Sequence, residues 1–279
     1  MPMTKHQGAV MISVQGVAIN VIDRGSGPSV LFLHGNPDSA QVWEQVITLM
    51  SPQFRCVAID LPGFGGSGPG DRLDISLENL AQFMNQVVDS LNLPEPVHLV
   101  VHDIGGPFGL AWVTRFPQRV GRLGILNTIF SSDYPWHAIA RVWRTPLLGE
   151  LSWLLFTPAT FVTVMQKQNP RLTKAQIMQT YRHITPAMKR MVLRFYRAMD
   201  PARFKDWEDE LGMVLQEKPA VVLWGDRDPY IPARFADRFG SQQVMHRPDN
   251  GHWLMLEDPS WVAAQLRRFF TEQATEPVR

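Results

Sequence analysis

One acidic residue, Asp103, stands in a context that would expose its side chain. It closes the apolar run 97–102 and is followed by Ile104, two glycines, a proline and a helix-like apolar stretch over 108–113. A strand, a tight turn through small residues and a helix together form a nucleophile elbow, which holds one side chain out at the edge of a sheet. The sequence therefore predicts that Asp103 is a carboxylate nucleophile.

A carboxylate nucleophile restricts the chemistry. Its attack on an ester would give a reactive mixed anhydride at little advantage. Its attack on an sp3 carbon, with opening of an epoxide or displacement of a halide, gives an ordinary ester on the enzyme. Water can then cleave that ester, so we expect a hydrolase that acts on an electrophilic sp3 carbon.

The base and its partner acid would come from the last third of the chain. His252 lies between the last apolar strand and the closing helix, where an imidazole could deprotonate the water that attacks the ester. Most of the other histidines, such as His246, are interpreted as structural or surface residues. Two carboxylates, Asp226 and Asp228, follow the strand that ends at Trp224, and the residue pattern alone leaves both open as the acid.

These side chains need a sheet to position them. The sequence predicts a hairpin from two runs, 11–15 and 17–22, and then strands at 29–33, 54–59, 97–101, 122–126, 220–224 and 243–246. Helices are expected over 76–91, from the elbow to 116, from 232 and from 259. Because strands alternate with helices after the hairpin, we expect a mostly parallel sheet covered on both faces.

A long insertion separates two of these strands. Residues 131–216 contain four tryptophans, many methionines and several helix-starting positions, but no convincing strand. Loops at the catalytic edge of a sheet carry such decorations, which favours a helical cap over the site. We therefore expect residues 1–130 and 217–279 to form the core and residues 131–216 to form the cap.

Several motifs carry a family resemblance that covers nearly everything outside the insertion. They occur in the family's order and are His34-Gly35-Asn36-Pro37, the glycine-rich run 60–67, the elbow 102–107, Leu126-Asn127-Thr128, Gly225-Asp226-Arg227-Asp228 and the run 249–253. The chain resembles the α/β-hydrolase superfamily, specifically its aspartate-nucleophile branch, which contains haloalkane dehalogenases and epoxide hydrolases. The resemblance implies an α/β-hydrolase fold, with a mostly parallel central sheet flanked by helices and an inserted helical cap.

The resemblance also assigns roles to residues. It implies that Asp103 is the nucleophile, that His252 is the base and that Asp228 is the acid that orients the imidazole, with Asp226 left as a turn residue. By the same analogy, the backbone N–H groups of Asn36 and Ile104 form the oxyanion hole. Neither a metal nor an organic cofactor is implied, because these groups complete the chemistry.

The substrate depends on what stabilises the leaving group. Dehalogenases of this family usually place a tryptophan directly after the nucleophile to hold the departing halide. Here that position is Ile104, which has no side-chain donor. The Asn36 amide offers one hydrogen bond, and a second would have to come from a cap tryptophan such as Trp136 or Trp143.

An epoxide instead needs a proton donor for its ring oxygen. The segment Phe195-Tyr196-Arg197 resembles the cap segment that supplies a tyrosine in epoxide hydrolases, so Tyr196 is the first candidate and Tyr181 the second. We therefore favour an epoxide hydrolase. The alternatives are a carbon–halogen hydrolase, a lactone-opening or decarboxylating relative, and, from a different class, a non-catalytic ligand-binding or receptor protein on the same fold.

The composition sets the remaining expectations. The chain has 279 residues and a net charge of +1, from 27 basic and 26 acidic side chains, with no basic cluster that alternates with aromatics. This balance argues against a nucleic-acid or membrane partner and for a small uncharged organic substrate that reacts with water. Cys56 is the only cysteine, and the N-terminal residues show no apolar export signal, so we expect a cytoplasmic protein without an internal disulfide. A homodimer is left open.

Overall fold

The computed structural model describes residues 10–241 and 243–272, which fold around one eight-stranded sheet. The strands lie in the order β1-β2-β4-β3-β5-β6-β7-β8. β1 and β2 form an antiparallel hairpin, β2 is also antiparallel to β4, and every other neighbouring pair is parallel. Their bounds are β1 Val10–Val14, β2 Val17–Arg24, β3 Ser29–Leu33, β4 Arg55–Ile59, β5 Val97–Asp103, β6 Val120–Thr128, β7 Ala220–Gly225 and β8 Gln243–Arg247. The predicted mostly parallel sheet is confirmed.

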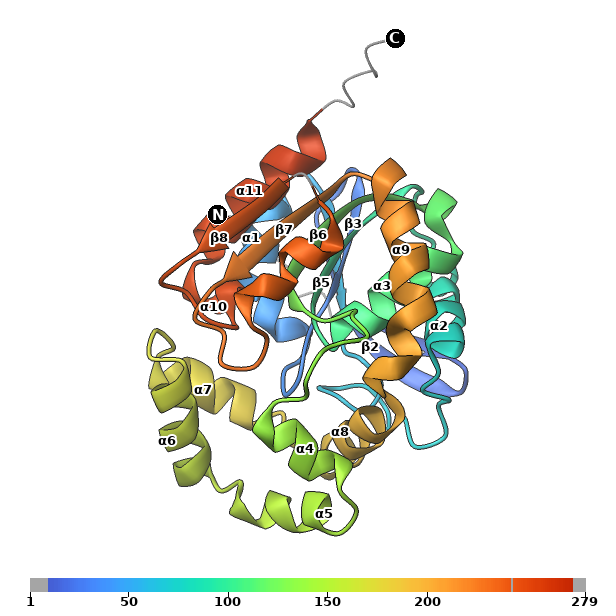
Figure 1. Ribbon diagram of the computed structural model, residues 1–279. Coiled ribbons are helices and arrows are strands. Elements are labelled where there is room, and N and C mark those ends of the chain that lie inside the picture. The colour runs from blue at the N-terminus through green and yellow to red at the C-terminus, as the bar shows by residue number, and fades with distance from the viewer. Residues whose placement is uncertain (1–9, 242, 273–279) are drawn as a thin grey trace.

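Helices cover both faces of this sheet (Figure 1). α2 (Leu77–Ser90), α3 (Gly105–Arg115) and α9 (Lys205–Glu217) pack together in one layer, while α1 (Glu44–Met50) packs on α11 (Pro259–Thr271) and on the short α10 (Leu254–Glu257) in the other. The central strands are apolar at nearly every position because both of their faces are buried. The core therefore consists of two apolar clusters, one on each face of the sheet, which together fix the strand ends that carry the site.

The remaining helices form a separate layer at one end of the sheet (Figure 1). They are α4 Ala138–Arg144, α5 Leu148–Ser152, α6 Pro158–Gln168, α7 Lys174–Tyr181 and α8 Pro186–Ala198. Threonines begin α6, α7 and α8, and each accepts a backbone N–H of the first turn. α9, at the end of the predicted insertion, lies on α3 beside the sheet. The domain limits 1–130, 131–216 and 217–279 stay predictions.

One predicted helix is wrong. The segment after Pro232 forms two 3-10 turns, η5 Ala233–Phe235 and η6 Asp237–Phe239, instead of a helix. Gly240, with φ 61°, ends the second turn after only a few residues, and a single α-helical turn is unfavourable to nucleate at this length. The two phenylalanines are buried and anchor the turns in the core.

Candidate active site

The chain turns sharply at Asp103. β5 ends at this residue, whose φ of 47° lies in the left-handed region, and α3 begins two residues later at Gly105. A Cβ on Gly106 would lie 1.9 Å from Thr128 Oγ1, and one on Gly105 would lie 2.7 Å from the His34 carbonyl oxygen. Only glycine fits at these two positions, and the Thr128 hydroxyl donates to the Asp103 carbonyl. The packing around the turn thus fixes the strained backbone that presents Asp103.

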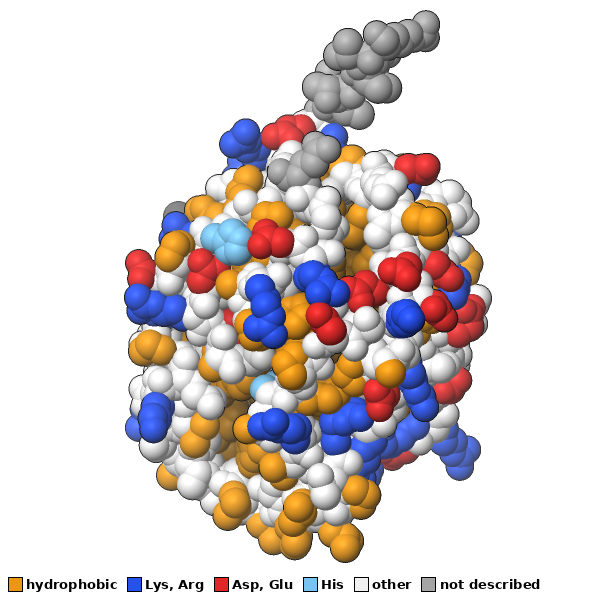
Figure 2. Space-filling model, viewed as in Figure 1, with side chains coloured by type: hydrophobic (Ala, Val, Ile, Leu, Met, Phe, Trp, Pro, Cys, Tyr) orange, Lys and Arg blue, Asp and Glu red, His pale blue; other side chains and the backbone are white. Residues whose placement is uncertain are grey.

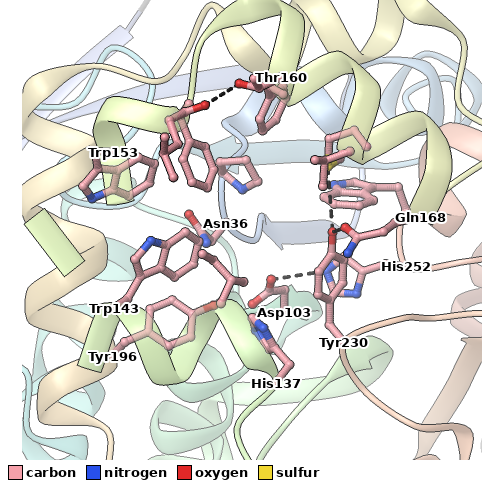
Figure 3. A pocket seen from close by; sticks show the side chains of 18 residues that line it. Asn36, Asp103, His137, Trp143, Trp153, Thr160, Gln168, Tyr196, Tyr230 and His252 are labelled. Atoms are coloured by element: carbon pink, nitrogen blue, oxygen red, sulfur yellow. Dashed lines mark hydrogen bonds and ion pairs between the residues drawn. The ribbon is translucent and has the colours of Figure 1, made fainter. Parts of the chain in front are cut away.

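Asp103, His252 and Asp228 are brought together in the order that the resemblance implied. His252 Nε2 lies 3.2 Å from Asp103 Oδ2, and its Nδ1 lies 2.7 Å from Asp228 Oδ2 (Figure 3 shows the contact with Asp103). Asp226 lies elsewhere and pairs with His246 at 2.6 Å. One imidazole therefore bridges two carboxylates, of which Asp103 faces the cavity.

Backbone and amide groups fix the orientation of Asp228. The backbone N–H groups of Tyr230 and Ile231 donate to Oδ1 at 2.7 and 2.9 Å, and Asn127 Nδ2 donates to Oδ2 at 2.9 Å. Asn127 is the second-last residue of β6 and has a φ of 31°, and its amide reaches across to this carboxylate. The sequence had placed Asn127 in a motif without a role, and the structure shows that it holds the acid in position.

The two carboxylates control the charge of His252, whose side chain is only 1% exposed. Burial works to lower the pKa of His252, but the charges of Asp228 and Asp103 and their hydrogen bonds outweigh burial and raise this pKa to about 10. The imidazole therefore holds a proton while Asp103 is ionised. Loss of the Asp103 charge would remove part of this support and lower the pKa of His252.

The loop that follows β3 closes against the nucleophile. A Cβ on Gly35 would lie 2.4 Å from Asp103 Cβ, so the backbone touches the Asp103 side chain here. His34 braces the loop, because its Nε2 accepts the Leu61 N–H at 3.0 Å and its Nδ1 donates to the Gly35 carbonyl at 2.7 Å. Asn36 thereby lies on the cavity wall, and Ile104 lies at the N-terminus of α3. Their role as oxyanion-hole donors stays a prediction.

A cavity of about 420 Å³ lies between the sheet edge and the cap helices (Figure 3). Most of its wall is aromatic or aliphatic, and Asn36, His137, Tyr196 and His252 surround Asp103, whereas Thr160 and Gln168 lie on other parts of the wall (Figure 3). The lining residues are Asn36, Pro37, Asp103, His137, Ile139, Trp143, Trp153, Leu155, Phe156, Thr160, Phe161, Val164, Met165, Gln168, Tyr196, Tyr230, His252 and Trp253. Such a cavity suits a small apolar molecule held by a few directed polar groups.

Three cap residues, Tyr196, Tyr181 and Trp136, were predicted to contact the leaving group, and the structure places them differently relative to the cavity. Tyr196 lines the cavity, and its ring extends from α8 toward Asp103 (Figure 3). Burial, together with the negative charge of Asp103, raises the pKa of Tyr196 well above its usual value, so its hydroxyl stays protonated.

Tyr181 and Trp136 are not lining residues of this cavity within the described part of the chain. The Tyr181 hydroxyl donates to the Phe156 carbonyl at 3.0 Å, so its proton is already engaged. Trp136 packs edge-on against Tyr196, with ring centroids 5.0 Å apart, and lines a small adjoining pocket that Asp103 and Ile104 also line. Contact of these two side chains with the substrate stays a prediction.

His137 is a cavity residue that the sequence analysis missed. It precedes α4, where its Nδ1 accepts the Ala140 N–H at 3.3 Å, and its ring lies beside Asp103 on the cavity wall (Figure 3). Burial lowers the pKa of His137 to about 4, against the raising effect of Asp103. The ring is therefore neutral, and since Nδ1 accepts, Nε2 carries the proton and is a donor. The only signal in the sequence is a polar residue just before the first cap helix.

Comparisons with known proteins agree with this geometry. A sequence model described as alpha/beta hydrolase fold matches residues 28–259. A cis-3-alkyl-4-alkyloxetan-2-one decarboxylase from Shewanella oneidensis is 25% identical over 99% of this chain and 91% of its own. A haloalkane dehalogenase from Mesorhizobium japonicum is 31% identical over 77% of this chain and 74% of its own. The crystal structure of haloalkane dehalogenase DbeA from Bradyrhizobium elkani superposes with a TM-score of 0.77, covering 94% and 96% of the two chains at 23% identity.

Proposed function

Since this chain belongs to the α/β-hydrolase fold family, in the branch that contains the haloalkane dehalogenases, we propose that it is a hydrolase that opens small apolar epoxides with water. Asp103 would form a covalent ester with an epoxide carbon, and His252 would activate the water that releases the diol. None of the relatives described above is named an epoxide hydrolase. The choice of epoxide is therefore supported by the geometry of the cavity and not by the comparisons.

The observation that carries this proposal is the pair of donors next to Asp103. The Tyr196 O–H and the His137 Nε2–H both lie on the cavity wall, and both groups hold their protons at neutral pH. Two hydrogen-bond donors, one O–H and one N–H, suit a leaving oxygen, which develops negative charge as its C–O bond breaks. The side chain of Ile104, directly after the nucleophile, offers no such donor.

In the first step, an Asp103 carboxylate oxygen attacks an epoxide carbon and the C–O bond breaks toward oxygen. Tyr196 and His137 hold the forming alkoxide, which takes up a proton to become a hydroxyl group. The proton can come from His252, which is protonated in the free enzyme. When Asp103 becomes a neutral ester, the imidazolium loses the carboxylate that stabilises it, and the pKa of His252 falls. The ester, a hydroxyl group and a neutral His252 result.

In the second step, the neutral His252 takes a proton from water, and the hydroxide attacks the carbonyl carbon of the ester. Asp228 stabilises the imidazolium that forms. The backbone N–H groups of Asn36 and Ile104 would hold the tetrahedral oxyanion. Its collapse releases the diol and restores both the Asp103 carboxylate and the protonated His252.

A second candidate is hydrolysis of a carbon–halogen bond. The indole N–H of Trp143 is buried without a hydrogen-bond partner among the described residues, and both Trp143 and Asn36 line the cavity. An unpaired indole N–H and an amide N–H are suitable donors for a departing halide. The relatives named haloalkane dehalogenase favour this candidate, while the relative named an oxetan-2-one decarboxylase favours a strained oxygen ring.

The test is intact mass spectrometry of a His252→Phe variant after exposure to epoxides or haloalkanes in separate panels. Without the base, the ester on Asp103 should persist. An adduct with the mass of the whole epoxide supports epoxide opening, whereas an alkyl adduct without halogen supports dehalogenation. A variant that also carries Asp103→Asn is the control and should show no adduct. If the folded single variant gives no adduct with any panel, the proposal is refuted.

A further inference from the structure

The net charge of the whole chain is close to zero, but the cap helices and the rest of the chain carry opposite net charges. The segment from α4 through α8, residues 138–198, contains ten lysines and arginines but only one acidic residue, Glu150. The cap helices therefore carry a formal charge of +9, and the rest of the chain carries −8. The sequence argument against a membrane partner used the net charge of the whole chain, which does not describe the cap.

The cap also exposes a cluster of large apolar side chains, which we name the apolar tip. Each member is more than half exposed, and Leu147 and Leu154 each reach 75%. Figure 2 shows hydrophobic side chains gathered at this end of the molecule, over α5, with basic side chains nearby. The apolar tip consists of Leu147, Leu148, Leu151, Leu154, Leu155 and Val164. A contiguous group of exposed leucines of this kind marks an interaction surface.

The helices of the apolar tip are two-sided. The inner sides of η3 (Trp153–Leu155) and α6 bury Trp153, Phe161 and Met165, which line the cavity, while Leu154 is exposed and is not a lining residue. Leu155 and Val164 are also exposed but lie at the rim of the cavity. No single described helix is long and apolar enough to cross a membrane, but the segments Leu148–Leu155 and Pro158–Gln168, bent by 94°, reach that apolarity together. Because their inner sides enclose the cavity, the geometry fits a segment that lies on a lipid surface.

Leu147 adds an independent observation. Its φ of 68° lies in the left-handed region, which is unfavourable for a bulky side chain, and its side chain is exposed. With a ψ of −46° this backbone also lies outside the αL well that asparagine tolerates, and glycine would adopt it with less strain. An exposed leucine held in a strained conformation gains nothing for the fold from its side chain, so the side chain points to an external contact.

The apolar tip is continuous with the cavity. Leu155 and Val164 belong to both, and the space-filling surface is hollowed between α6 and α4 (Figure 2). Two exposed basic residues belong to the helices on either side of this hollow, Arg141 on α4 and Lys167 on α6. Apolar side chains and cations thus surround one entrance.

We propose that the apolar tip docks on the surface of an anionic lipid bilayer, with its leucines at the headgroup boundary and exposed basic side chains of the cap, such as Arg141 and Lys167, near lipid phosphates. The positive charge of the cap disfavours a second copy of this chain as the occupant, because two caps of +9 would repel each other across such an interface. Docking would turn the cavity entrance toward the lipid, so that apolar substrates enter from the membrane. This last step rests on the proposed function, whereas docking itself does not.

Vesicle flotation tests the docking. The wild-type protein should float with vesicles of phosphatidylcholine and phosphatidylglycerol but bind poorly to phosphatidylcholine alone, and added salt should weaken the binding. A Leu147→Asn, Leu154→Gln double variant should bind the anionic vesicles at least about tenfold more weakly, because two leucines no longer enter the interface. Both leucine side chains are 75% exposed and contribute little to the core, so the melting temperature should not fall. The matched control is Met213→Gln on α9, which removes an exposed apolar side chain outside the segment from α4 through α8 and should leave binding unchanged.

Three outcomes would overturn the docking proposal. They are wild-type protein that does not float with anionic vesicles, binding that does not depend on phosphatidylglycerol, and equal loss of binding in the control variant. Sedimentation of the same proteins tests whether a second copy of the chain occupies the surface. A wild-type dimer that becomes a monomer in the tip variant, together with no vesicle binding, would assign the surface to a second copy. Hydrolysis of a water-soluble epoxide should be the same in the wild type and the tip variant. Failure of the proposed function therefore leaves the vesicle result interpretable.

Discussion

Neutralising Asp103 should lower the pKa of His252, and an Asp103→Asn variant measures by how much. The charged Oδ2 and Nε2 atoms are 3.2 Å apart, and at an effective dielectric constant of about 20 two unit charges at this distance attract by about 5 kcal/mol. That energy corresponds to about 4 pKa units as an upper limit. Because the Asp103 side chain is 13% exposed and an amide keeps a hydrogen bond, we expect a decrease of about 2 pKa units, from about 10 to about 8.

The assay is an NMR titration of the His252 imidazole in the wild type and in the variant. Asp228→Asn should lower the pKa further, because the Asp228 charge is the larger of the two carboxylate contributions. Asp226→Asn is the control, since Asp226 pairs with His246 and not with His252. The uncharged amide in Asp103→Asn mimics the neutral ester. The measurement therefore also tests whether ester formation lowers the pKa of His252 enough for it to act as a base. An unchanged His252 pKa in Asp103→Asn would refute the reasoning for base activation.

Three further predictions concern the surroundings of the site. Tyr196→Phe should lower kcat by roughly a hundredfold with little change in KM, because a leaving-group donor is lost in the transition state; an unchanged kcat in steady-state assays would remove Tyr196 from the mechanism. Gly35→Ala should reduce the free energy of unfolding in urea by roughly 1–3 kcal/mol, because its Cβ would lie 2.4 Å from Asp103 Cβ, and equal stability would contradict this packing. Burial raises the pKa of Asp38 from 3.8 to about 6, so the stability tied to its proton is present below about pH 4 and lost as pH rises through 6. Asp38→Asn should therefore stabilise the protein by up to about 3 kcal/mol at pH 8 but not at pH 4, as measured by chemical unfolding. If burial does not destabilise the Asp38 carboxylate, the effect of the substitution will be the same at the two pH values.

The sheet could be predicted because its signals are local. Each central strand is an apolar run bounded by turn residues, and burial on both faces follows from the alternation with helices. The prediction of a helix after Pro232 was wrong because the structure of this segment depends on contacts that are not local. Its boundaries depend on how Phe235 and Phe239 reach the core and on the left-handed Gly240, and the pattern of residues does not contain this information.

The catalytic carboxylates and the base also follow from local signals, because strand ends place Asp103, Asp228 and His252 at one sheet edge. The cap does not share this property. Which side of a cap helix faces the cavity depends on its packing against other helices. The sequence could rank Tyr196 above Tyr181 only by resemblance, and the structure places Tyr196 alone of the two on the cavity wall. Charge counted over the cap alone would have shown its excess of cations.

This division explains why sequence similarity does not select the substrate. The groups that form and hydrolyse the ester come from the core, and a relative at 25% identity over nearly the whole chain and one at 31% over most of it are named for different reactions. The side chains proposed to meet the leaving atom come largely from the cap, namely His137, Trp143 and Tyr196, which line the cavity. Ile104 is the exception, because a change at this core position removes or adds a donor without altering the elbow. Substrate class in this chain should therefore follow the cap donors and residue 104, and exchanging Ile104 for tryptophan tests this with the core left in place. If that exchange leaves the preference between epoxide and haloalkane unchanged, the choice of leaving group lies with the cap alone.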